Sequence, residues 1–240
     1  MRDYPFIFLE PDVGAIGKAL SKYGIAVLPG YLDNIEVAAA EREARRLLAD
    51  HPCYAQALSS YPDGNGIRVE RERASIDCTQ LGNVFDRLWM REVAKIFFGV
   101  QPYVFNHDLN IVLDVIGTEH AAHRVHYDRM HQLKFFLYLT DTSVTNGAFH
   151  CLPGSHYHAK KVQRDNRCRL QLPPSSETRL CAPEFTTGLI PVEGSAGSLM
   201  VIDSDVAHCG AKILCGQRLS VRSRSYHPAY LARWSSMPLS

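Results

Sequence analysis

Residues 133–140 read Leu-Lys-Phe-Phe-Leu-Tyr-Leu-Thr, and after a polar turn residues 147–152 read Gly-Ala-Phe-His-Cys-Leu. Stretches this rich in aromatic and branched residues, bounded by turn residues, are typical of β-strands. Further segments of the same character lie on both sides, at 103–114, 123–128, 198–203 and 218–226. Because parallel strands need long crossovers between them, short strands without intervening helices predict an antiparallel sandwich or barrel.

The first hundred residues have a mostly helical character. Residues 11–22 carry apolar side chains at helical spacing, and residues 24–30 predict a short buried strand that ends in a Pro-Gly turn. Asp33 or Asn34 is expected to cap a helix that continues to about Leu48. The buried stripe of that helix is expected to consist of Val37, Ala40, Ala44 and Leu47.

The remaining segments complete a one-domain organisation over residues 1–240, with a helical layer to about 100 and a β-core over about 101–230. Asn83 is a candidate cap for a further helix, and residues 51–80 are polar enough to predict a loop region. Residues 160–196 contain several prolines and predict a lid-like insertion. The helix that Asn83 would cap is expected to face the core with Phe85, Leu88, Trp89, Val93 and Phe97.

Composition argues against several classes of protein. The formal net charge is +1, from 26 basic and 25 acidic residues, so neither a nucleic acid nor another polyanion is an expected partner. The seven cysteines are scattered and form no CxxC pair, which favours neither a disulfide framework nor a zinc knuckle. The N-terminus lacks the layout of a signal peptide and no apolar run is long enough to span a membrane, so we expect a cytoplasmic protein.

Candidate chemistry begins at His126-Tyr127-Asp128. In an extended strand, residues i and i+2 point to the same face, so His126 and Asp128 can present an imidazole and a carboxylate to one ion. This pair alone is explained equally well by a hydrogen bond between the two side chains. His208 follows another buried segment, and Arg218 enters a strand ten residues later. Two histidines and one carboxylate form the facial triad that binds non-haem Fe(II), and an arginine nearby suits a distal carboxylate.

The chain resembles the phytanoyl-CoA dioxygenase-like branch of the Fe(II)/2-oxoglutarate oxygenases, from Tyr23 to about Tyr226. The middle of the resemblance is the most specific, because its pattern of Leu-Thr-Asp, Asn-Gly-Ala-Phe and Leu-Pro-Gly-Ser-His has no generic folding reason to occur. The stretches that carry the resemblance are 126–128, 136–141, 146–149, 152–156, 203–208 and 216–218.

The resemblance implies a mainly β fold with flanking helices, built on a double-stranded β-helix (a cupin-like jelly roll). It assigns iron to His126, Asp128 and His208, and the C5 carboxylate of 2-oxoglutarate to Arg218. Asn110 and Lys134 are further candidate cofactor contacts. The alternatives are a strand-edge amide for Asn110 and a surface position for Lys134.

Candidate substrate contacts rest on position alone. Arg129 and His131 follow the His-x-Asp motif closely and could reach the substrate, although a surface position is the favoured alternative. Arg222 shares the strand parity of Arg218 and can point toward an anionic substrate group, with an ordinary salt bridge as the alternative. His156 is expected to be structural.

The implied activity is oxidation of an unactivated C–H bond in a small metabolite or natural-product intermediate, with O2 as co-substrate and release of succinate and CO2. The carboxylate of Asp128 favours hydroxylation, desaturation or cyclisation over halogenation, because related halogenases carry a small residue at this position. The alternatives are a non-redox cupin-like isomerase or binding module, or a hydroxylase of protein side chains. The expected partner is a small molecule, with neither nucleic acid nor membrane.

Overall fold

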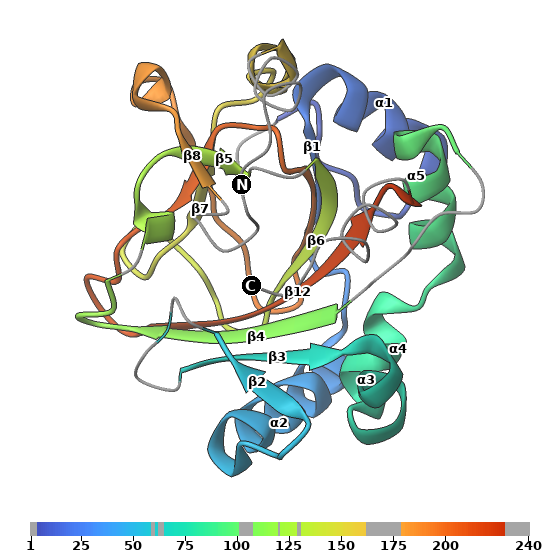
Figure 1. Cartoon of the computed structure of the whole chain (residues 1–240), viewed down its shortest axis with the longest axis vertical. Coiled ribbons are helices and arrows are strands. Elements are labelled where there is room, and N and C mark those ends of the chain that lie inside the picture. The colour runs from blue at the N-terminus through green and yellow to red at the C-terminus, as the bar shows by residue number, and fades with distance from the viewer. Residues whose placement is uncertain are drawn as a thin grey trace, which may run out of the picture.

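Two antiparallel sheets face each other and form the β-core (Figure 1). The structure is a computed structural model that describes residues 4–58, 61, 65–100, 108–119, 121–128, 131–161 and 179–228. In strand order, the larger sheet consists of β1 (Ile25–Leu28), β10 (Leu199–Asp203), β6 (Gln132–Tyr138), β12 (Gln217–Tyr226), β4 (Asp108–Val115), β3 (Gly66–Glu70) and β2 (Ala55–Ala57). The smaller sheet consists of β8 (Arg179–Cys181), β5 (His126–Asp128), β11 (His208–Gly210), β7 (Phe149–Cys151) and β9 (Ile190–Val192).

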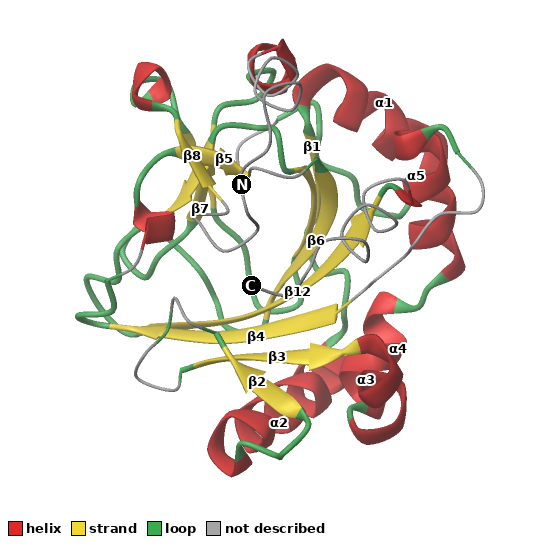
Figure 2. Cartoon of the chain, viewed as in Figure 1, coloured by secondary structure: helices red, strands yellow, loops and turns green. Residues whose placement is uncertain are grey.

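Five α-helices lie on the outer side of the larger sheet (Figure 2). They are α1 (Val13–Tyr23), α2 (Asn34–Asp50), α3 (Arg71–Asp77), α4 (Thr79–Phe85) and α5 (Leu88–Phe98), and short 3-10 turns cover Ala121–His123 and Pro183–Phe185. Within the described residues, no helix is both long and apolar enough to cross a membrane. Two facing antiparallel sheets with flanking helices confirm the predicted fold class.

The two faces of the larger sheet have different chemistry. Successive side chains of a strand point to opposite faces. On β6, Phe135 points outward, where its ring meets Trp89 of α5 at 6.1 Å between centroids. Lys134 and Phe136 take the opposite face and line a cavity between the sheets. The same alternation on β12 buries Leu219 and Val221 in the apolar core and leaves polar residues facing the cavity.

Tyr138 links the two sheets. Its hydroxyl donates to the carbonyl of Val192 on β9 and accepts from the N–H of Phe149 on β7, at 2.9 Å in both cases. The ring is fully buried, and burial raises the pKa of the phenol to about 12. The neutral hydroxyl therefore satisfies a donor and an acceptor of the smaller sheet from a strand of the larger one.

The N-terminal elements confirm their sequence predictions. Asp12 caps α1, and β1 falls within the expected strand at residues 24–30. Asp33 caps α2 through a full capping box with Glu36. The buried residues of α2 are the predicted stripe of Val37, Ala40, Ala44 and Leu47.

The expected cap at Asn83 is wrong. Asn83 lies inside α4, and α5 begins at Leu88 after a break at Asp86 and Arg87, with no side-chain cap. The helical spacing of apolar residues in the sequence runs across this break and does not reveal it. Leu88 is consequently 78% exposed instead of facing the core, whereas Val93 is buried as expected.

The loop prediction for residues 51–80 is also wrong. This segment contains β2, β3, α3 and the start of α4. Residues 66–70 pair antiparallel with β4, and that neighbouring edge, rather than a strong local pattern, makes them a strand. The N-terminal layer is therefore partly β, since β1, β2 and β3 all belong to the larger sheet.

The predicted lid-like insertion at 160–196 is described only in part, because residues 162–178 lie outside the described residues. Within the described part, β8 pairs with β5 and β9 pairs with β7, so both strands belong to the smaller sheet. The sequence did not predict β8, β9 or β11, each of which is only three residues long.

Replacing Asp33 by alanine is expected to lower the free energy of unfolding by about 1 kcal/mol, because the first turn of α2 loses the acceptor for two backbone N–H groups. Chemical denaturation monitored by circular dichroism measures this change. Asp50→Ala at the opposite end of α2 is the control, and equal losses in both variants would contradict the capping role.

Candidate functional site

His126, Asp128 and His208 converge at the inner side of the smaller sheet. His126 on β5 is the direct cross-strand partner of His208 on β11, and their ring centroids are 4.3 Å apart. Asp128 Oδ1 lies 4.0 Å from His126 Nε2, and one ligand atom from each residue lies within 4.8 Å of the others. All three side chains are buried. The structure thus brings together the three residues that the sequence assigned to a metal.

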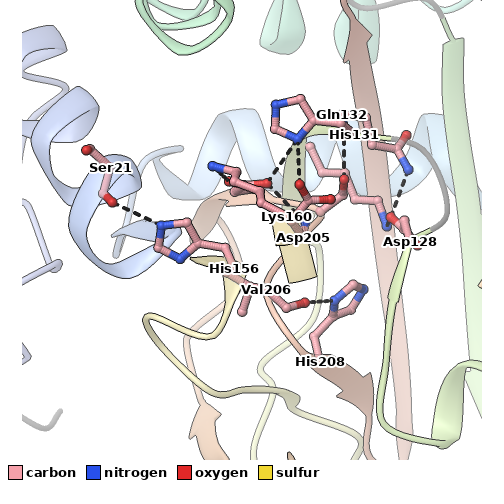
Figure 3. A network of polar contacts seen from close by, with 12 residues as sticks. Ser21, Asp128, His131, Gln132, His156, Lys160, Asp205, Val206 and His208 are labelled. Atoms are coloured by element: carbon pink, nitrogen blue, oxygen red, sulfur yellow. Dashed lines mark hydrogen bonds and ion pairs between the residues drawn. The ribbon is translucent and has the colours of Figure 1, made fainter. Parts of the chain in front are cut away.

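Hydrogen bonds indicate which nitrogen of each imidazole can bind an ion. His126 Nδ1 lies 2.7 Å from the carbonyl of Arg124. Figure 3 shows the equivalent contact of His208, whose Nδ1 lies 2.6 Å from the carbonyl of Val206. A carbonyl only accepts, so each Nδ1 must carry the hydrogen. Both neutral rings therefore have a lone pair on Nε2, the arrangement found in metal-binding histidines.

The carboxylate of Asp128 is held from its other side. Oδ2 accepts from Gln132 Nε2 at 2.8 Å and forms an ion pair with Lys134 Nζ. Gln132 and Lys134 lie two residues apart on β6 and share its inner face. These contacts engage Oδ2 and fix the direction in which Oδ1 meets the histidines.

An open cavity of about 470 Å³ adjoins these residues, between the two sheets. Its walls combine cations with aromatic and apolar side chains. The lining residues are Tyr61, Val112, Asp114, Ala122, His126, Lys134, Phe136, Phe149, His208, Gly210, Arg218, Ser220 and Arg222.

Arg218 reaches the cavity as a buried cation with a buried partner. Its Nε and Nη2 lie 3.1 and 2.6 Å from Asp114 Oδ2, on the neighbouring strand β4, and its Nη1 donates to the carbonyl of Gly147. Burial lowers the pKa of the guanidinium, but the Asp114 carboxylate, together with Tyr138 and Tyr61, raises it by more, so the net shift of the pKa is upward. Of its five N–H hydrogens these contacts use three, and one remains on each Nη atom.

Two glycines make room for this guanidinium. A Cβ at Gly210 would stand 3.2 Å from Arg218 Nη2. At Gly147 it would stand 2.3 Å from the side chain of Ile213, and φ is +93°, a conformation that favours glycine. The Asn-Gly-Ala-Phe stretch of the sequence therefore has a local function, because it brings a carbonyl acceptor against Arg218.

The other predicted site residues divide into two groups. Lys134 and Arg222 line the cavity. Asn110 does not line it; its amide donates to Asp108 Oδ1 at 2.9 Å, although the residue is buried on the same face of β4 as Asp114. Arg129 lies outside the described residues.

His131 belongs to a second polar cluster, away from the cavity lining. Its Nδ1 lies 2.9 Å from Asp205 Oδ2, and its ring stacks on Phe97 at 4.9 Å (Figure 3). Asp203 lies beside them and pairs with Lys160 Nζ at 2.9 Å. Because a lysine already supplies a cation, this cluster is a set of ion pairs that joins β10 to its surroundings.

His156 is structural, as expected. It is fully buried, and its Nε2 lies 3.0 Å from the carbonyl of Ser21 at the end of α1 (Figure 3). Burial lowers the pKa of its imidazole. The ring thus connects the turn after β7 to the helical layer.

Sequence reasoning missed three contributors to the site. Asp114 could not be recognised from the sequence, because only the strand register shows that it lies opposite Arg218. Gln132 could have been found from strand parity, since it lies two residues before Lys134. Tyr61 gave no signal, because it lies in a segment interpreted as loop; its ring packs over Gly66, where a Cβ would approach within 2.7 Å.

Comparison with protein families gives one match over most of the chain. The model of the phytanoyl-CoA dioxygenase (PhyH) family matches residues 20–218. No curated protein sequence matches the chain significantly.

Solved structures share the fold at low sequence identity. The epimerase SnoN, solved with Fe3+, alpha ketoglutarate and nogalamycin RO, is 21% identical with a TM-score of 0.64, over 94% of this chain and 90% of that one. EctD from S. alaskensis, with 2-oxoglutarate and 5-hydroxyectoine, is 17% identical with a TM-score of 0.64, over 95% and 82%. The carbocyclase SnoK from nogalamycin biosynthesis is 16% identical with a TM-score of 0.62, over 93% and 92%.

Replacing Asp114 by asparagine is expected to lower the free energy of unfolding by about 3 kcal/mol, because the buried Arg218 cation loses its counter-charge. Denaturant unfolding of the metal-free protein measures the loss. Asp141→Asn is the matched control, since Asp141 is exposed and accepts only a backbone N–H. A loss of equal size in the control would contradict the role of the ion pair.

Proposed function

The chain belongs to the phytanoyl-CoA dioxygenase family of Fe(II)- and 2-oxoglutarate-dependent oxygenases, and we propose that His126, Asp128 and His208 bind its iron. The observation that carries this proposal is that two imidazoles and one carboxylate each offer a ligand atom within 4.8 Å of the other two. Two imidazoles and a carboxylate on one side of an ion leave the opposite positions open.

The residues around the triad fit an iron centre. Each histidine donates its second ring nitrogen to a backbone carbonyl, and Asp128 is supported by Gln132 and Lys134. Such outer contacts orient the ligands of metal sites and strengthen binding. The donor set is also wrong for a structural zinc site, which favours four protein ligands and usually includes cysteine.

We assign the C5 carboxylate of 2-oxoglutarate to Arg218. The hydrogens that remain on Nη1 and Nη2 form the end of the guanidinium fork, which suits a carboxylate in bidentate geometry. Asp114 and the carbonyl of Gly147 hold the guanidinium plane in the cavity, so the fork keeps one direction. Lys134 is already paired with Asp128, and its proposed role is to support that ligand.

Bound iron and 2-oxoglutarate supply the oxidising chemistry, in which 2-oxoglutarate and O2 are converted to succinate and CO2 while a substrate C–H bond is oxidised. The protein contributes orientation and a cavity of limited access. We propose that the substrate is a small molecule, because the cavity beside the two histidines lies between the sheets and combines aromatic side chains with a few charged ones. The structural neighbours named for nogalamycin RO and 5-hydroxyectoine are consistent with this class.

Hydroxylation is the outcome we propose for the C–H bond. Asp128 supplies a carboxylate at the ligand position that is small in halogenases. Desaturation and cyclisation start from the same oxidation and differ in how the substrate is held. The protein therefore determines the outcome through the geometry of the cavity wall.

Asp128→Ala is expected to abolish succinate production that depends on Fe(II) and 2-oxoglutarate, because the triad loses its only carboxylate. Oxygen uptake and succinate release in the purified protein measure this activity. Asp86→Ala on the surface is the control. Near-normal turnover in the Asp128 variant would show that the ligand assignment is wrong, and no uptake by the wild-type protein would favour a non-redox jelly-roll protein.

Arg218→Lys is expected to raise the KM for 2-oxoglutarate about tenfold or more, because lysine keeps the charge but loses the planar fork. Steady-state kinetics with varied 2-oxoglutarate measures the change. Iron affinity, measured by competition with a chelator, is the internal control and should stay at the wild-type value. An unchanged KM would contradict the anchoring role of Arg218.

A further inference from the structure

We infer that the substrate carries a carboxylate group and that Arg222 binds it. This inference rests on the proposed function, because it takes Arg218 as the anchor of 2-oxoglutarate. It adds a chemical class to the substrate, which neither the fold nor the family determines.

Arg222 lies in the same cavity as His126 and His208, beside an aromatic wall. Phe149 stacks on the ring of His208 with centroids 5.2 Å apart, and Phe136 follows at 5.9 Å from Phe149. The guanidinium carbon of Arg222 lies 5.6 Å from the centre of the Phe136 ring. A molecule that lies along this wall can therefore place one end near the metal ligands and the other at Arg222.

Arg222 differs from the other cations on the inner face of the larger sheet. Lys134 pairs with Asp128, Arg218 pairs with Asp114, and Arg224 pairs with Asp108. Within the part of the chain that the structure describes, no carboxylate pairs with Arg222. Its Nε is buried and has no hydrogen-bond partner. Arg222 is therefore the cation lining the cavity whose charge no described carboxylate balances, and an anionic ligand can supply the missing charge.

The register of the sheet explains why no protein group meets this need. The cross-strand neighbours of Arg222 are Asn110 on β4 and Phe136 on β6. Phe136 offers only its ring, and the amide of Asn110 donates to Asp108. Arg218 therefore has an aspartate opposite it on β4, whereas Arg222 has an amide on β4 and an aromatic ring on β6.

The charge of the loaded cavity leads to the same class of ligand. Lys134, Arg218 and Arg222 line the cavity, and their counter-charges are Asp114 and Asp128. Fe(II) and the 2-oxoglutarate dianion cancel each other when both are bound. One positive charge then remains in a partly closed cavity, and a substrate with a single negative charge neutralises it.

The surroundings favour an organic carboxylate over an inorganic anion. Val112, Phe136 and Phe149 supply apolar surface in the same cavity as Arg222 and the two histidines. The planar guanidinium matches a carboxylate in bidentate geometry. The substrate we infer is therefore a small carboxylic acid whose apolar part lies against the aromatic wall.

Matched probes test this inference on the protein loaded with Fe(II) and 2-oxoglutarate under anaerobic conditions. The probes are 3-phenylpropanoate and hexanoate, each compared with its primary amide by isothermal titration calorimetry. We expect at least one acid to bind about tenfold more tightly than its amide in the wild type, the difference expected for a charge-assisted hydrogen bond. Arg222→Gln should remove this preference and Arg222→Lys should keep part of it.

The visible absorption of the Fe(II)–2-oxoglutarate complex, measured in the same variants, separates the inference from its premise. A wild-type protein that forms no such complex would refute the proposed function. If the complex forms, the inference fails when neither acid binds better than its amide, when Arg222→Gln retains the preference, or when that variant loses affinity for 2-oxoglutarate. Arg42→Gln, on the outer helix α2, removes the same charge and should leave every measured value unchanged.

Discussion

The inner face of the larger sheet buries cations at positions where a sandwich of this size would otherwise bury apolar side chains. A charge that leaves water is tolerated only when an opposite charge and hydrogen bonds replace the water. Asp108 serves this purpose for Arg224 and Arg68, at 2.5 and 2.7 Å, and Asp114 does so for Arg218. The order of β6, β12, β4 and β3 brings these partners side by side, so sheet topology and charge pairing depend on each other.

This pairing also prepares the proposed site before any ligand arrives. Arg218 is fixed by Asp114 and Gly147, and Asp128 is fixed by Gln132 and Lys134. Groups that are already ordered lose little side-chain entropy on binding, which is the usual source of affinity in a preorganised site. Arg222 is the exception on this face, and it differs from Arg218 in the residue opposite it on β4, which is Asn110 for Arg222 and Asp114 for Arg218.

The sequence predicted the residues whose types are unusual for their positions and missed those whose role depends on a partner. His126, Asp128, His208 and Arg218 stood out because few folds need such residues at such spacing. The structure brings His126, His208 and Arg218 to one cavity and places Asp128 beside the two histidines. Asp114 is an ordinary strand residue until β12 places Arg218 opposite it. The three-residue strand β11 has no pattern of its own and exists because β5 and β7 flank it. Leu88 was misplaced because a helical period cannot show a break at Asp86.

The seam between β5 and β11 is narrow. The two strands share a single register pair, His126 with His208, whereas β11 and β7 share three. An ion held by both histidines and Asp128 would link β5 to β11 across this seam, and so connect two parts of the chain that are remote in sequence. Bringing residues so far apart in the sequence together costs conformational entropy. The folded β-core already brings them together before any ion binds. Metal binding at the triad would therefore strengthen the connection between β5 and β11 as well as supply the chemistry of the site.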